Sequence, residues 1–139
     1  RVALKLLPDF LLGNEESLAR FGKEALAASA ISHPNIAHIY EAGSENNLHF
    51  IAMEYVQGET LRQLLKNKRL DIVSALDIVW QTANALASAH SAGIIHRDIK
   101  PENIMIRKDG YVKILDFGIA KLTKSRTTDS KANPPTALP

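Results

Sequence analysis

The sequence has 139 residues, of which 45% are hydrophobic and 23% are charged, so it can form the buried core of one ordinary domain. It contains no cysteine, which excludes disulfide bonds and thiolate metal sites. The net charge of +2 comes from the basic segment 121–139 rather than from the body of the chain, so we predict no dedicated nucleic-acid-binding face.

Strands are predicted to dominate the first part of the chain. Apolar runs that end at Pro8 or flank a turn-rich segment are typical of strands, and apolar residues at helical spacing predict one helix between them. The predicted elements are a strand at Val2–Leu7, a helix from about Glu16 to Ile31, a strand at 36–40, a turn at 43–47 and a strand at 48–55.

Helices are predicted to dominate after Gly58. Thr60 and Gln63 form a capping-box pattern ahead of a short helix that ends near Lys66. The remaining predicted elements are a long helix from about Asp71 to Ala92, a strand at Ile104–Arg107, a turn at 108–110 and a strand at Tyr111–Leu115. From Thr123 onward polar residues and proline replace any periodicity, which predicts disorder.

The long helix carries a wide apolar stripe, which predicts that the helix is largely buried. The histidine at its end is expected to be a core residue. The stripe consists of Ile72, Leu76, Val79, Ala83, Leu86 and His90, with Val73, Trp80 and Ala87 beside it.

Two motifs contain the candidate catalytic residues. The first is His96-Arg97-Asp98, followed by Asn103 five residues after the aspartate, and the second is Asp116-Phe117-Gly118. A lone aspartate in a loop is more often a turn or cap residue, but here two motifs follow one another across a predicted hairpin. Asp98 could orient an acceptor hydroxyl or accept its proton. Asn103 and Asp116 offer the hard oxygen ligands that Mg²⁺ prefers. Phosphoryl transfer from ATP requires positioning and charge neutralisation of this kind.

These motifs resemble those of protein kinases of the eukaryotic type, bacterial members included. The run 96–103 (HRDIKPEN) resembles the catalytic loop, DFG at 116–118 the metal-binding motif, and VALK at 2–5 the lysine strand. The resemblance covers residues 1–122 and implies a truncated two-lobed α+β fold. The implied parts are a partial small lobe at 1–57, the first half of the large lobe at 58–122 and the start of the activation segment at 123–139.

The resemblance implies ATP and Mg²⁺ as cofactors, with Asn103 and Asp116 as the metal ligands. It makes Asp98 the residue that acts on the acceptor hydroxyl, Lys100 the residue that steadies the transferring phosphate, and Lys5 the contact to the α- and β-phosphates. Glu24 is the expected partner of Lys5, because a carboxylate on an apolar helix stripe requires a compensating charge.

The same resemblance implies an adenine pocket. Met53 would line its back, the Glu54 carbonyl and the Val56 N–H would hydrogen-bond the adenine edge, and Ala3 with Met105 would sandwich the ring. Core packing of Met53 is compatible with this role, because adenine pockets are apolar with few polar anchors.

Two further residues of the loop are informative by resemblance. Lys100, followed by Pro101 and Glu102, is typical of serine/threonine kinases rather than tyrosine kinases. Arg97 resembles the arginine of kinases that are activated by phosphorylation, where it could pair with a phosphothreonine of the activation segment. His96 and Phe117 are expected in a packed internal spine without a chemical role.

The sequence therefore predicts a serine/threonine protein kinase that acts on protein substrates. No Gly-rich phosphate loop precedes Lys5 and no end of an activation segment follows DFG, so we expect a partial domain, inactive in isolation, that begins inside a longer protein. No segment is apolar enough to span a membrane, no signal peptide is present, and a cytoplasmic location is expected. The oligomeric state and the particular substrate are not predicted.

Two other functions are possible. A non-catalytic pseudokinase that binds ATP as a scaffold would be marked by loss of a motif residue, yet the two aspartates, the asparagine and Lys5 are all present. A small-molecule phosphotransferase of the same fold typically lacks residues like Arg97 and the run 100–102.

Overall fold

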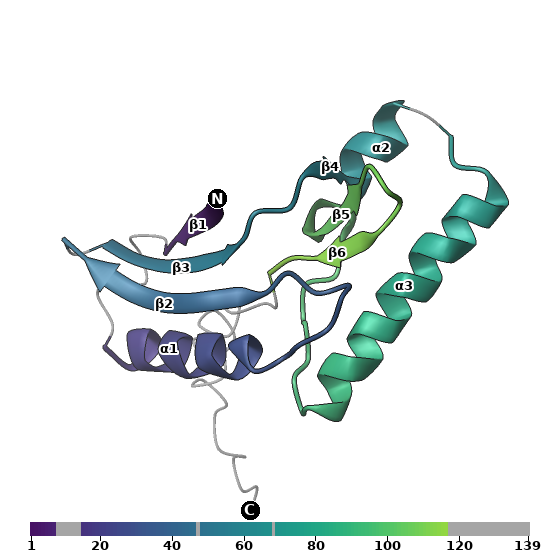
Figure 1. Ribbon diagram of the computed structural model, residues 1–139. Helices are drawn as coiled ribbons and strands as arrows, with labels where there is room; N and C mark the ends of the chain where they lie inside the picture. Colours follow the sequence, from purple (N-terminus) through teal and green to yellow (C-terminus); the bar gives the residue numbers. More distant parts are fainter. Residues whose placement is uncertain (8–14, 47, 68, 117–139) are drawn as a thin grey trace, which may run out of the picture.

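The computed structural model describes residues 1–7, 15–46, 48–67 and 69–116, without the side chains of residues 15–17, 20 and 24. Two three-stranded antiparallel sheets form the framework, and helices pack beside them (Figure 1). This combination of separate sheets and helices is the predicted α+β class. The disorder predicted for 123–139 lies outside the described residues.

The first sheet has the strand order β1-β3-β2. Its strands are β1 (Val2–Leu6), β2 (Ile39–Glu45) and β3 (Leu48–Glu54), and helix α1 (Glu15–Ser29) lies along one face (Figure 1). Phe21, Ala25 and Ala28 of α1 are buried in the same cluster as Ile51 and Met53 of β3. The helical spacing of these residues is what allows one face of α1 to cover the sheet.

Strand β2 differs from the prediction. The segment 43–47 was expected to be a turn, but residues 43–45 continue β2 and pair with β3, and the chain turns at Asn46, whose φ is +49°. Glycine and serine are common in turns, as at Gly43 and Ser44. Here pairing with β3 satisfies their backbone hydrogen-bonding groups, and this tertiary contact overrides the local turn preference. Residues 36 and 37 precede β2 and bind Ile114 of the second sheet instead.

The second sheet has the order β4-β5-β6, formed by β4 (Gly58–Thr60), β5 (Ile104–Arg107) and β6 (Val112–Ile114). Strand β4 was not predicted, because three residues are too few for a periodic pattern. It approaches β5 so closely that a Cβ on Gly58 would lie 2.2 Å from the Ile106 carbonyl oxygen. Helix α2 (Leu61–Asn67) begins with the predicted capping box, in which the Thr60 N–H and the Gln63 side chain are 2.8 Å apart.

The long helix α3 (Ile72–Ser91) has the predicted ends. Asp71 caps its start, with a carboxylate oxygen 2.9 Å from the Ser74 N–H, and Gly93 follows it with a φ of +76°. A short 3-10 turn, η2 (Pro101–Asn103), precedes β5. Within the described ranges, no helix is both long and apolar enough to cross a membrane.

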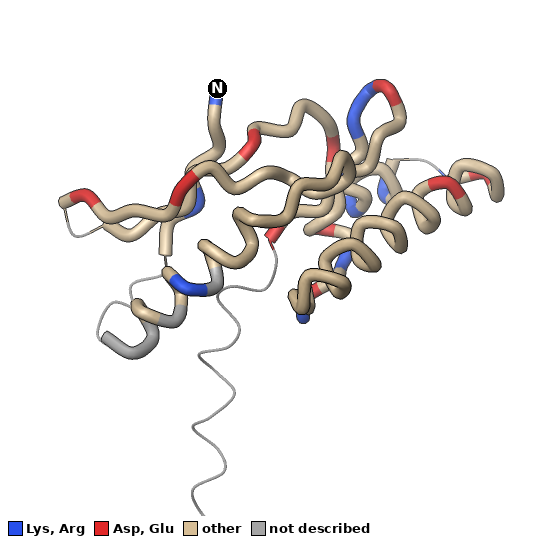
Figure 2. Tube along the Cα trace, turned by 60° about the horizontal axis from the view of Figure 1, so that its bottom comes forward, with Lys and Arg blue, Asp and Glu red and all other residues tan. Residues whose placement is uncertain are grey.

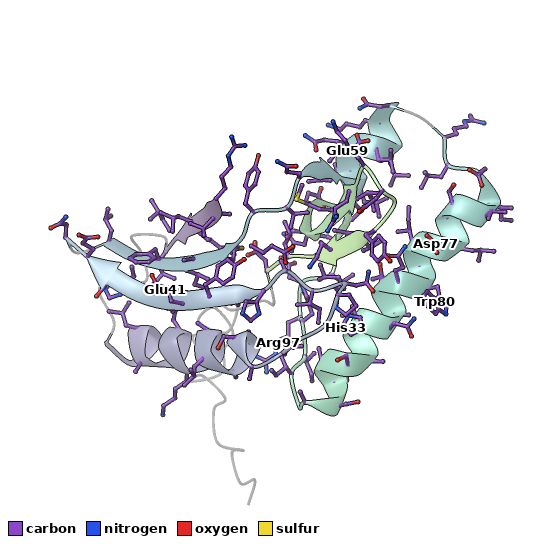
Figure 3. All side chains as sticks on the ribbon, viewed as in Figure 1. His33, Glu41, Glu59, Asp77, Trp80 and Arg97 are labelled. Carbon is purple, nitrogen blue, oxygen red and sulfur yellow. The ribbon has the colours of Figure 1, made fainter. Side chains whose placement is uncertain are left out.

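The predicted buried face of α3 is wrong. The residues buried on α3 are Ile78, Gln81, Ala85 and Ala89, whereas Ile72, Leu76 and Val79 are 77%, 63% and 63% exposed. Trp80 projects from α3 away from β6 (Figure 3), and His90 is exposed rather than in the core. The helix is apolar around most of its circumference, so hydrophobicity alone could not select the side that packs.

Strand β6 joins the two halves of the core. Ile114 belongs to the larger cluster, with Ile36, Ile39 and Met53, and Val112 belongs to a smaller one under α2 and α3. Both side chains are completely buried. The strand therefore connects the first sheet to α3.

Two neighbouring residues of α3 test its orientation. Ile78→Ala should lower the free energy of unfolding of residues 1–139 by about 2–4 kcal/mol, because it leaves a cavity in the smaller cluster. Val79→Ala should change it by less than about 0.5 kcal/mol, because Val79 is exposed. Denaturant titration of both variants measures the difference. A larger effect at Val79 would mean that the helix packs through the opposite face.

Candidate active site

His96 is 1% exposed and ties the loop between α3 and η2 to Leu115, the residue that directly follows β6. Its Nε2 lies 2.8 Å from the Leu115 carbonyl oxygen, and its Nδ1 lies 3.3 Å from the Asp98 backbone N. Since a carbonyl only accepts, Nε2 carries the proton and Nδ1 accepts from the Asp98 N–H. Burial lowers the pKa of His96 below its usual value, so the ring stays neutral in this arrangement. As predicted, His96 is a buried packing residue.

Asp98, Lys100 and Asn103 converge within this loop. The Lys100 ammonium lies 2.8 Å from a carboxylate oxygen of Asp98, and Asn103 donates from Nδ2 to the Asp98 carbonyl oxygen at 2.9 Å. The hydrogen bond to Asp98 raises the pKa of Lys100, so its positive charge is retained beside the carboxylate. Asn103 is 8% exposed, whereas Lys100 is exposed, so a buried amide and an exposed cation flank Asp98.

Asp116 follows β6 and reaches the first sheet. A carboxylate oxygen of Asp116 lies 2.8 Å from the Lys5 ammonium of β1, and both side chains are about one-third exposed. Asp116 has a φ of +54°, a conformation that costs energy for a residue with a side chain. The predicted Lys5 partner, Glu24, lies on α1, but its side chain is outside the described residues, so that pairing stays a prediction.

Arg97 also adopts a left-handed conformation, with a φ of +64°, and its side chain is exposed. It lies in the loop beyond the C-terminal end of α3 (Figure 3). The activation segment that would supply a phosphothreonine partner lies outside the described residues, as does Phe117.

The donor set is suited to a hard cation. The Asn103 amide nitrogen is engaged by the Asp98 carbonyl, which leaves its oxygen as the acceptor available to a metal. The Asp116 carboxylate adds an anionic oxygen, and the two residues are linked because the Leu115 N–H donates to the Asn103 carbonyl at 2.8 Å. Among the described residues, no three His, Cys, Asp or Glu side chains cluster as a metal cage. Mg²⁺ fits this set, because it needs few protein ligands when phosphates complete its shell.

The predicted adenine residues lie on both sheets. Ala3 of β1 pairs directly with Met53 of β3, and Met53 is 9% exposed within the core. Val56 is buried just beyond β3. Met105 lies on β5 in the second sheet, half-buried, opposite Lys113 of β6.

Sequence reasoning missed the side-chain partner of Glu54. Its carboxylate lies 2.8 Å from the Lys113 ammonium of β6 and accepts a hydrogen bond from the His38 N–H. Burial of Glu54 opposes ionisation, but these two hydrogen bonds and the positive charges of Lys113 and Arg107 together outweigh it and lower the pKa of the carboxyl group. Lys113, whose side chain is 11% exposed, also donates to the Ile36 carbonyl oxygen. The end of β3 is therefore tied to β6. In the sequence, the only signal that Lys113 is buried is that its neighbours along the chain are apolar.

A pocket of about 760 Å³ borders the segment that joins the two sheets. It is lined by α2, by the start of α3 and by the β5–β6 turn, with Glu59, Asp77 and Lys108 among its polar residues. It contains none of the residues predicted to bind the nucleotide.

Comparison with known proteins identifies the family of the chain. A family model described as protein kinase domain matches residues 1–135. The serine/threonine-protein kinase pkn3 of Myxococcus xanthus is 47% identical over 137 residues, which are 94% of this chain and 25% of that protein. The serine/threonine-protein kinase PrkC of Bacillus subtilis is 44% identical over 127 residues, 91% of this chain and 20% of that protein.

A solved structure gives the same result. The kinase domain of Mycobacterium tuberculosis PknI superposes with a TM-score of 0.77 at 33% identity, over 86% of this chain and 48% of that one. The chain belongs to the protein kinase family, as part of a eukaryotic-type serine/threonine kinase domain akin to those of bacteria. It spans about half of the solved domain and a quarter or less of the two relatives.

The ion pair between Glu54 and Lys113 makes a testable prediction. Lys113→Met should raise the pKa of Glu54, because burial then acts against fewer opposing hydrogen bonds. Carbon-detected NMR titration of the Glu54 carboxyl measures the shift. Arg62→Met is the control, because it removes only the exposed Arg62–Glu102 pair.

The same pair predicts a pH dependence of stability. Because folding lowers the Glu54 pKa below its ordinary value of 4.5, the stabilisation is complete above about pH 4.5 and is lost as the pH falls through the folded-state pKa. Lys113→Met should therefore lower stability more at neutral pH than near about pH 3. An equal loss at both pH values would contradict this assignment.

Proposed function

We propose that the protein containing this chain is an ATP-dependent serine/threonine protein kinase. The observation that carries the proposal is the convergence of Asp98, Lys100 and Asn103 in one loop, fastened to the strand that presents Asp116 to Lys5. We also place the division between two lobes near residue 58, between the end of the first sheet and the start of the second.

In the proposed reaction, Asp98 receives or orients the hydroxyl of a serine or threonine in a protein substrate. The Lys100 ammonium, held against Asp98, balances negative charge on the phosphoryl group in transfer. Asn103 and Asp116 would hold Mg²⁺, and Lys5, which pairs with Asp116 in this structure, would contact the phosphates. When bound, Mg-ATP supplies the phosphoryl group and neutralises the charge that develops on its oxygens.

The adenine ring is proposed to bind beside the end of β3. Ala3 and Met105 would contact its two faces, and Met53 would limit the depth of the pocket. The Glu54 carbonyl and the Val56 N–H would recognise the adenine edge. The pairing of the Glu54 side chain with Lys113 supports this, because it ties the end of β3 to β6.

Two parts of the proposal rest on the loop and its surroundings. The run 100–102 supports a protein hydroxyl as acceptor, and the exposed Arg97 supports control by phosphorylation of the activation segment. The use of ATP fits a cytoplasmic location for this part of the protein. Glu24 remains the proposed second partner of Lys5.

Asp98→Asn tests the catalytic proposal. In the full-length protein that contains these residues, the substitution should lower the rate of phosphate transfer from ATP to a protein substrate by about 10²–10⁴-fold. This is the range expected for loss of a general base. Asp109→Asn, in the exposed β5–β6 turn, is the matched control and should leave transfer unchanged. Unaltered transfer in Asp98→Asn would favour the pseudokinase function.

The exposed face of α3 predicts weak activity of residues 1–139 alone. Figure 2 shows α3 almost free of charge outside its N-terminal part, and its apolar residues Ile72, Val73 and Leu76 are exposed. A patch of this kind favours self-association unless other segments of the protein cover it. Purified residues 1–139 should show little or no phosphate transfer in a radiolabelled ATP assay. Robust transfer would contradict the prediction.

A further inference from the structure

Two buried amides, Asn35 and Gln81, meet beneath β6. They are 7% and 9% exposed, and Asn35 donates from Nδ2 to the Gln81 side-chain oxygen at 2.8 Å. Asn35 lies in the loop between α1 and β2, a few residues after α1 ends, and Gln81 lies in the middle of α3. The pair therefore connects two elements that are 46 residues apart in sequence.

Both amides also bind the backbone of β6. Asn35 donates to the Val112 carbonyl at 2.9 Å, and the Val112 N–H donates to the Gln81 side-chain oxygen at 2.9 Å. The Ile114 N–H donates to the Asn35 carbonyl at 2.8 Å. We call Asn35, Gln81 and these contacts the amide clamp. It supplies hydrogen-bond partners to the backbone of β6 along the edge that does not pair with β5.

The far end of Gln81 is anchored as well. Its amide nitrogen lies 2.8 Å from an Asp77 carboxylate oxygen and 3.2 Å from the Gly110 carbonyl oxygen. Every polar atom of the Gln81 side chain is thus engaged, which restricts its rotation. An amide side chain whose oxygen and nitrogen are both hydrogen-bonded can fix the position of a strand, whereas one with an unused polar atom is free to rotate.

Asp116 depends on this strand. It lies two residues beyond Ile114, and the intervening Leu115 binds Asn103 and His96 through its two backbone groups. Strand β6 has only three residues, so its own pairing with β5 is short. A shift of β6 would move Asp116 relative to Asn103, the other proposed metal ligand.

We propose that Asn35 and Gln81 are positioning residues that hold β6, and through it Asp116, in the place where Mg²⁺ bound to nucleotide is received. The inference rests on the proposed function. It differs from a purely structural role because it predicts a loss of metal affinity that loss of stability does not explain.

The test compares Gln81→Met, Asn35→Leu and the double variant in the longest natural protein that contains these residues. The control is Thr82→Val, one position along α3, which removes a hydroxyl bonded to its own helix. Calorimetry measures Mg²⁺ affinity in the presence of a non-hydrolysable ATP analogue. Each variant is measured at the same interval below its own melting temperature, so that general destabilisation is matched.

Each single clamp variant should bind Mg²⁺ about 10–100-fold more weakly, the range for loss of residues that orient metal ligands. The double variant should be no weaker than the worse single one, because the two amides act as a unit. Amide hydrogen exchange at Leu115 should also accelerate. Thr82→Val should match the parent protein in both measurements. Gln81→Asn, which retains a shorter amide, should weaken binding too and replaces Gln81→Met if that variant does not fold.

Unchanged Mg²⁺ affinity in folded clamp variants would overturn the inference. The proposed function fails separately, if the parent protein binds no Mg-nucleotide or if Asp98→Asn leaves phosphate transfer intact. A parent protein that binds Mg²⁺ through Asp116, together with clamp variants that bind it equally well, would overturn the clamp alone.

Discussion

Strand β6 has hydrogen-bond partners on both edges, and the arrangement of the site depends on that pairing. One edge meets β5, and the other meets the loop at residues 35–37 and the side chain of Gln81. A strand of three residues cannot hold its place by its own ladder, so the partners outside the sheet decide its position. Through these partners β6 connects the second sheet to α3 and to the loop that joins α1 to the first sheet.

The charges of the site are organised around the same strand. The Lys5–Asp116 pair joins β1 to the end of β6, and the Lys100–Asp98 pair lies in the loop that His96 fastens to Leu115. Both pairs are partly exposed, so each contributes little to stability and can be rearranged when phosphate arrives. The left-handed backbone of Asp116 is consistent with a residue held for function at some energetic cost.

The sequence could predict features that depend on local chemistry. The motifs located the loop and Asp116, and the capping box and Asp71 located helix starts, because these signals involve neighbouring residues. Features that depend on tertiary contacts were predicted poorly. The buried side of α3 was wrong, since Gln81 is polar yet buried, and its apolar neighbours are exposed. The pairing of Lys113 with Glu54 spans 59 residues and left no local pattern.

The location of the metal in a nucleotide complex is the most direct measurement. Mn²⁺ can replace Mg²⁺ and broadens the NMR signals of nearby nuclei. With Mn²⁺ and a non-hydrolysable ATP analogue bound to the longest natural protein, the signals of Asn103 and Asp116 should broaden first, and those of Asp71 and Asp77 at the far end of α3 should stay sharp. Broadening centred on Asp77, or none near Asn103 and Asp116, would contradict a metal site held by β6.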